Sequence, residues 1–246
     1  ILKNCSKWLQ SSTKPQIDPL KVPADPFVAF KKQMKSMLKK NNVFFQELNA
    51  LNFLKIDCQI FLEDARATSI ESNSVAAIIT SPPYVTSYEY ADIHQLTGFW
   101  YEYINDLPQF RKNFIGTFYS LNQETTTSSF IGQEIINDLI LKDKRYAKEV
   151  SNYFNDMQTV AREMHRILKP NGHVCMVIGN TTFKDVRIKS AEVFSEILTS
   201  LGFNLVEVIK RSIPYKLIPT IRDSSSGKFT KLTNTNGKLV YPEEYI

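Results

Sequence analysis

The chain has 246 residues, of which 43% are hydrophobic, with a formal charge of +5 at pH 7 and three cysteines. This composition is sufficient for one sizeable core, and no apolar run reaches the roughly 18 residues that a membrane span needs. Three isolated cysteines disfavour a disulfide framework and are typical of a reducing, cytoplasmic setting. The basic charge permits a polyanionic partner such as DNA, but equally basic proteins bind no nucleic acid.

The first part of the chain is predicted to be an arm. Residues 1–26 are polar and contain four prolines, which indicates a linker. A short amphipathic helix is predicted over Phe27–Lys40, and its lysine face is either solvated or turned toward phosphate. We therefore divide the chain into an arm, residues 1–45, and a main domain, residues 46–246.

Two short apolar runs predict buried strands. Ile56–Leu62 ends at the acidic pair Glu63-Asp64, and Val75–Thr80 runs directly into Ser81-Pro82-Pro83-Tyr84. The aromatic-rich residues 85–145 that follow are interpreted as an insertion, and they are the best local candidate for a region that contacts DNA.

The next part of the chain alternates helices with strands. Apolar residues recur at spacings of three and four from Val150 to Leu168, which predicts a long amphipathic helix. The turn Lys169–Gly172 ends it, and His173–Gly179 is predicted to be another buried strand. A second amphipathic helix is predicted over Ser190–Leu201, and a strand over Asn204–Ile213.

The order of these elements predicts the fold class. Strands that alternate with helices indicate an α/β fold with a mostly parallel, doubly wound sheet. Phe229–Leu232 and Lys238–Tyr241 are expected to close it with an antiparallel hairpin. In such sheets ligands bind at the carboxyl ends of the strands, where the acidic pair and the Ser-Pro-Pro-Tyr motif are expected to lie.

Ser81-Pro82-Pro83-Tyr84 is the most informative motif because it directly follows a buried strand. The exocyclic amine of a nucleobase is a poor nucleophile, since its lone pair is delocalised into the ring. A serine hydroxyl and a fixed backbone carbonyl can accept hydrogen bonds from that amine, and prolines preorganise such carbonyls by fixing φ. The tyrosine ring can stack on a base that has left the duplex. The alternative is an ordinary turn, which this context disfavours.

Thr80–Tyr84 resembles the catalytic loop of the DNA amino-methyltransferases. Cytosine-N4 members of that family typically carry Ser-Pro-Pro-Tyr, and adenine-N6 members more often begin with Asp or Asn. The segments Phe61–Ala65 and Arg166–Gly172 are similar to the family's flanking elements, and the resemblance covers about residues 56–215. It implies a Rossmann-like fold that uses S-adenosylmethionine.

The resemblance also implies roles for single residues of the loop. Ser81 and Pro82 would bind the target amine, Pro83 would shape the loop, and Tyr84 would stack on the base.

Further residues are candidates for the cofactor and the base. Asp64 would contact the cofactor, with Ala65 and Thr80 as neighbours; the alternative for the Asp64 side chain is a helix N-cap. Candidates for the base pocket are Tyr88, Tyr90 and Asn180. The three histidines have no metal-ligand spacing, so no metal site is predicted.

One feature departs from the family. Members bind the methionine part of the cofactor with a glycine-rich turn, whereas the first glycine here is Gly98. The chain is therefore expected to be an excerpt of a longer chain, one subunit of an enzyme completed by a second chain or segment, or a degenerate product. In each case the methyltransferase fold is expected to be incomplete.

The resemblance implies site-specific methylation of double-stranded DNA at N4 of cytosine, in a flipped-out base, for restriction–modification or host marking. Adenine N6 is the alternative within the class, and RNA or protein amines are a further enzyme alternative. A DNA-binding subunit or remnant without catalysis, lacking the cofactor half, is the alternative from another class. No membrane partner is expected.

Overall fold

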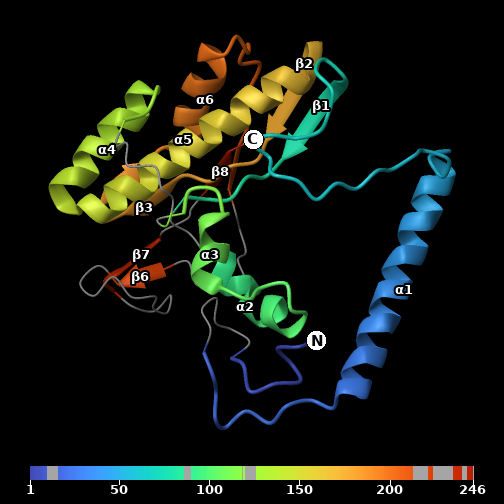
Figure 1. Cartoon of the computed structure of the whole chain (residues 1–246). Coiled ribbons are helices and arrows are strands. Elements are labelled where there is room, and N and C mark those ends of the chain that lie inside the picture. Colours follow the sequence, from blue (N-terminus) through green and yellow to red (C-terminus); the bar gives the residue numbers. More distant parts are fainter. Residues whose placement is uncertain are drawn as a thin grey trace. The chain divides into compact units, whose positions relative to one another are not determined.

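A computed structural model describes residues 1–9, 16–85, 90–117, 119, 126–212, 221–223, 235–239 and 243–245 (Figure 1). The chain divides into two compact units. The first comprises residues 1–62 and 89–110, and the second comprises residues 63–88 and 111–246. Within the described ranges, no helix is both long and apolar enough to cross a membrane.

The longest helix of the first unit is α1 (Pro26–Ala50). Its start is well specified, because Asp25 accepts a hydrogen bond from the Val28 backbone N–H at 2.8 Å and proline occupies the first helical position. The helix continues past Lys40, where the apolar pattern predicted its end. None of its residues is buried. The same unit contains α2 (Tyr90–Trp100), and α3 (Leu107–Lys112) crosses the boundary between the units.

The predicted strand over Ile56–Leu62 is wrong. Residues 56–62 have no regular secondary structure, and the side chains of Ile60 and Leu62 are fully exposed, at 93% and 102%. A buried parallel strand needs a neighbouring strand and a covering layer of helices. The described residues supply neither to this segment, so its apolar pattern has nothing to pack against.

Two predicted strands are present at the centre of the second unit, but they are not buried. No residue of Val75–Thr80 is buried, and in the second strand, which runs from Leu168 to Met176 instead of from His173 to Gly179, only Leu168 is buried. β1 (Val75–Thr80) and β2 (Leu168–Met176) pair in parallel, with Ala77 opposite His173 and Thr80 opposite Met176. The predicted turn at residues 169–172 is an irregularity in this ladder. Asn171 there adopts φ 63°, a left-handed conformation that asparagine tolerates better than most residues.

Helices cover one face of this pair. Successive residues of a strand point to opposite faces, and Ile78 and Val174 pack on the hydrophobic core. On the other face Ile79 is 82% exposed and Cys175 is also exposed. The described part of the chain therefore builds one helical layer against the sheet.

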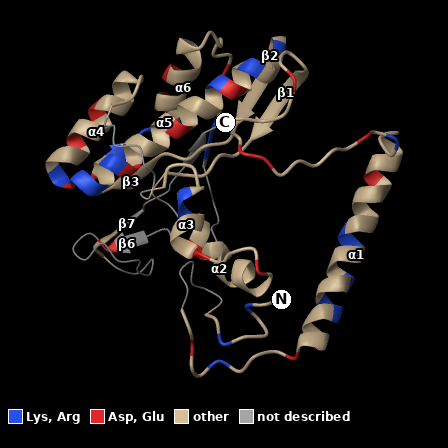
Figure 2. Ribbon diagram, viewed as in Figure 1, with Lys and Arg blue, Asp and Glu red and all other residues tan. Residues whose placement is uncertain are grey.

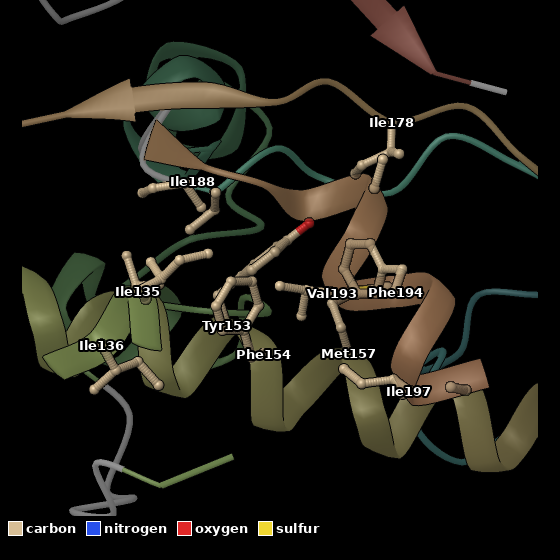
Figure 3. Close-up of a cluster of buried hydrophobic side chains, with 14 of the residues drawn as sticks. Ile135, Ile136, Tyr153, Phe154, Met157, Ile178, Ile188, Val193, Phe194 and Ile197 are labelled. Atoms are coloured by element: carbon tan, nitrogen blue, oxygen red, sulfur yellow. The ribbon is translucent and has the colours of Figure 1, made fainter. Parts of the chain in front are cut away.

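Three helices form that layer: α4 (Phe130–Lys142), α5 (Lys144–Ile167) and α6 (Ser190–Ser200). The predictions of α5 and α6 are confirmed, and α5 begins earlier than expected because Asp143 caps it. Between β2 and α6 lies an unpredicted antiparallel pair, β3 (Thr181–Phe183) and β4 (Val186–Ile188). Figure 3 shows how side chains from these elements meet over α5.

The C-terminal part differs from the prediction. Residues 204–209 form no strand; only β5 (Lys210–Ser212) does, and it pairs antiparallel with β8 (Glu243–Tyr245). β7 (Gly237–Leu239) pairs with β6 (Ile221–Asp223), not with residues 229–232, which lie outside the described residues.

The fold class is therefore confirmed in its coarser form. The protein has α/β structure and antiparallel pairs near its C-terminus, but the described strands make one parallel pair and three antiparallel pairs. A mostly parallel sheet was the wrong expectation for these residues, because their short strands pair two by two and three of the four pairs are antiparallel.

Candidate active site

The Ser-Pro-Pro-Tyr loop lies at the carboxyl end of β1, as the sequence predicts. Thr80 is the last residue of the strand, and its carbonyl accepts a hydrogen bond from the Val177 backbone N–H at 2.9 Å. Ser81 is exposed, whereas Pro82 is buried. The serine of the loop is therefore accessible to solvent, while the proline that follows it is packed in the protein.

The second half of the loop is held from two sides. The hydroxyl of Tyr153 donates a hydrogen bond to the Pro83 carbonyl at 2.6 Å. The ring of Tyr84 lies so close to Gly179 that a Cβ added there would come within 3.0 Å of Tyr84 Cε2. Gly179 therefore leaves the space that the Tyr84 ring occupies.

Asn180, a candidate for the base pocket, is engaged with α6. Its side chain is buried, its Oδ1 accepts a hydrogen bond from the Ala191 backbone N–H at 2.9 Å, and its Nδ2 donates to Glu192 Oε2 at 2.9 Å. The Asn180 amide thus supplies an acceptor for a backbone N–H in the first turn of α6, which has no acceptor within the helix. Both ends of the Asn180 amide are already engaged within the protein, and its role in the base pocket stays a prediction.

The acidic pair begins a tight turn instead of a helix. The Asp64 carboxylate accepts from the Arg66 backbone N–H at 2.9 Å and from Arg66 Nη2 at 2.7 Å. The helix N-cap alternative for Asp64 is therefore wrong. The hydrogen bond from the Arg66 side chain lowers the pKa of Asp64. Asp64 is still 48% exposed and Ala65 is exposed, so a ligand can reach this turn.

Arg66 connects this turn to α5, a link that the sequence analysis missed. Its Nη1 donates to Asp156 Oδ1 at 3.2 Å. The other oxygen of Asp156 accepts from the Gly116 backbone N–H at 2.7 Å. The pKa of Arg66 is raised, chiefly by its hydrogen bond to Asp64. Asp156 thus binds two loops that are far apart in the sequence, one at Arg66 and the other at Gly116.

A second ionic cluster fixes the connection from the acidic turn to β1. Buried Glu163 on α5 accepts from the backbone N–H of Thr68 at 2.8 Å and from its hydroxyl at 2.6 Å. Arg166 donates to Glu163 at 2.6 Å and also to the Ile70 carbonyl at 2.7 Å. Hydrogen bonds from Arg166 are the main cause that lowers the pKa of Glu163 to about 2.

One face of α5 therefore holds both predicted parts of the site. Tyr153 binds the loop after β1, and Asp156, three residues later and so on the same helix face, binds Arg66 of the acidic turn. Polar atoms inside the apolar pattern of this helix were the weak sign of these anchors in the sequence.

Two candidates for the base pocket stay predictions. Tyr90 is the first residue of α2 in the first unit, and Tyr88 lies outside the described residues.

The candidate site is separate from a cavity of about 740 Å³ between β2, α6 and residues 203–208. None of the lining residues belongs to the Ser-Pro-Pro-Tyr loop or the acidic turn.

Comparison with known proteins agrees with the geometry. The family model for DNA methylases matches residues 75–246, which include the loop after β1 and all of α5. The chain is 26% identical over 189 residues to the Type II methyltransferase M.MvaI of Kocuria varians, over 69% of this chain. It spans 40% of the length of that relative. No solved structure matches. Because the family match covers more than half of its residues, the chain belongs to the DNA methylase family.

Proposed function

We propose that this chain forms the target-base part of a site-specific DNA methyltransferase, which methylates N4 of cytosine in a base flipped out of double-stranded DNA. The proposal is carried by the position of the Ser81–Tyr84 loop at the end of β1, with its serine exposed and its second half anchored.

The loop residues fit the needs of an amine acceptor. The Ser81 hydroxyl and the Pro82 carbonyl would accept hydrogen bonds from the two N–H groups of the target amine. This draws the nitrogen toward a tetrahedral state in which its lone pair can attack a methyl carbon. The ring of Tyr84, supported by Gly179, would stack on the flipped base. These groups cost little reorganisation, because prolines and contacts with α5 already fix the backbone.

The fit to S-adenosylmethionine is partial. The carboxylate of Asp64 is exposed, with Ala65 beside it, and offers hydrogen-bond acceptors to the adenosine end of the cofactor. Thr80, the last residue of β1, is the third residue that we propose for cofactor binding. Among the described residues, no glycine-rich turn is available for the methionine end. When bound, the cofactor supplies an electrophilic methyl group. We therefore propose that a further segment or second chain contributes that turn.

Three finer points belong to the same proposal. Serine in the first position favours cytosine N4, and adenine N6 is the alternative. A role in restriction–modification is suggested by the Type II relative, and a cytoplasmic location fits an enzyme that acts on DNA. We keep residues 46–246 as the catalytic domain and 1–45 as an arm, with a DNA-contacting insertion over 85–145.

The test is methyl transfer to mixed-sequence plasmid DNA by the full chain, alone and together with a segment or second chain that supplies the glycine-rich turn, with digestion of the product to separate N4-methylcytosine from N6-methyladenine. We expect N4-methylcytosine, and a loss of about 100-fold in kcat for Ser81→Ala, since one preorganised acceptor contributes on that order. Ser195→Ala, which removes a hydroxyl bonded to the Ala191 carbonyl within α6, is the matched control.

Each outcome has a definite meaning. Equal activity of wild type and Ser81→Ala would contradict the assignment of the loop. A folded chain that binds DNA but neither binds S-adenosylmethionine nor methylates, even when the glycine-rich turn is supplied by a further segment or second chain, would favour the non-catalytic DNA-binding alternative.

A further inference from the structure

We infer that Tyr153 is a positioning residue for methyl transfer, acting through its hydrogen bond to Pro83; this role rests on the proposed function. The hydroxyl and the Pro83 carbonyl oxygen are 2.6 Å apart, a short O–H···O hydrogen bond. Tyr153 is 2% exposed, so little water competes for its hydroxyl.

The bonded atom controls the one free backbone angle of Pro83. The proline ring fixes φ of Pro83, so its ψ decides where the next peptide plane points. Because that peptide is planar, the direction of the Pro83 carbonyl also sets the direction of the Tyr84 N–H and Cα. A donor that holds this carbonyl therefore fixes the starting point of the Tyr84 ring.

Tyr153 is itself held firmly. Gly116 adopts φ 68°, and a Cβ added there would come within 2.8 Å of Tyr153 Cβ and 2.7 Å of its Cδ2. On another side the ring of Phe194 makes an edge contact, with 6.0 Å between ring centroids. Figure 3 shows Tyr153 extending from α5 with its hydroxyl oxygen directed away from the helix.

Packing alone does not require this hydroxyl. A phenylalanine would fill nearly the same volume, and a buried hydroxyl costs free energy unless it is hydrogen-bonded. The hydroxyl meets that requirement by binding the backbone of the candidate catalytic loop. With Gly179 against the Tyr84 ring, the loop is fixed on both sides of the Pro83–Tyr84 peptide.

The test is Tyr153→Phe, with Tyr146→Phe as the control. Tyr146 is on the same helix, but its ring packs on Phe183 at 4.2 Å. Proline labelled with ¹³C at the carbonyl and tyrosine labelled with ¹⁵N give NMR correlations only from Pro-Tyr peptides. The chain has two of these, Pro83-Tyr84 and Pro214-Tyr215. Tyr84→Phe identifies the first by removing its signal.

We expect Tyr153→Phe to shift the Pro83 carbonyl resonance and to leave that of Pro214 in place. In methylation assays kcat should fall about tenfold, the size expected for one hydrogen bond, with KM for DNA changed less than about twofold. Tyr146→Phe should change neither property.

An unmoved Pro83 resonance, or a moved one with unchanged kcat, would overturn the inference. A purely structural role predicts a lower melting temperature with unchanged kcat, which thermal unfolding of the same variants would reveal. If the wild-type chain transfers no methyl group even in the presence of a segment or second chain that supplies the glycine-rich turn, the proposed function fails. The carbonyl resonance then still decides whether Tyr153 holds the loop.

Discussion

Helices α1 and α5 are nearly equal in length, at 25 and 24 residues, yet their surroundings are opposite. Both have an apolar face and charged residues, and Figure 2 shows lysines along α1 and charges of both signs on α5. Twelve residues of α5 are buried, whereas none of α1 is. An apolar stripe therefore specifies a helix that can pack, but the partner must come from elsewhere in the sequence.

The strongest test of this comparison is a pair of phenylalanine truncations. Phe154→Ala on α5 should destabilise the protein by about 3–5 kcal/mol, because it opens a cavity in the core. Phe44→Ala on α1 should change the free energy of unfolding by less than about 0.5 kcal/mol, since that side chain is exposed. Urea denaturation measures both. A large cost at Phe44 would show that α1 is covered in solution.

A smaller effect is expected at the polar anchors of α5. Asp156→Ala should cost about 1–3 kcal/mol, because the Gly116 N–H and one side of the Arg66 guanidinium lose their acceptor. Asp138→Ala removes an exposed carboxylate from α4 and is the control. Chemical denaturation of the two variants compares them. Equal stabilities would mean that the link between Asp156 and Arg66 contributes nothing measurable.

The last effect is a dependence of stability on pH, which appears only in acid. Hydrogen bonds from Arg166 lower the pKa of Glu163 from 4.5 to about 2, so in that range the unfolded chain binds more protons than the folded one. This contribution to stability is complete above pH 4.5 and is lost as the pH falls toward 2. Glu163→Gln should flatten the acid limb of a plot of melting temperature against pH. Glu134→Gln, at an exposed position of α4, should not.

Local pattern explains which elements could be predicted. The spacing of Val150, Phe154 and Met157 is a property of one segment, and it identified α5 before any partner was known. The apolar run of β1 and the motif after it were equally local. The strand expected at Ile56–Leu62 depends on neighbours outside the segment, and its sequence could not tell that they are missing among the described residues.

The candidate site divides in the same way. The Ser81–Tyr84 loop could be found from its residues, because its four residues are contiguous and directly follow an apolar run. Its supports could not, since Tyr153 and Pro83 are seventy residues apart, and Thr68 and Glu163 ninety-five. Two hydrogen-bonded residues so far apart produce no periodic pattern in the sequence.

The placement of these supports on a single helix has a consequence for insertions and deletions. Each residue added to an α-helix turns everything beyond it by about 100° and moves it by about 1.5 Å. One residue inserted between Tyr153 and Asp156 would therefore point one support away from its loop while the other stayed in place. The number of residues between Tyr153 and Asp156 therefore fixes the spacing of the two supports. A change of even one residue there would separate the two parts of the candidate site.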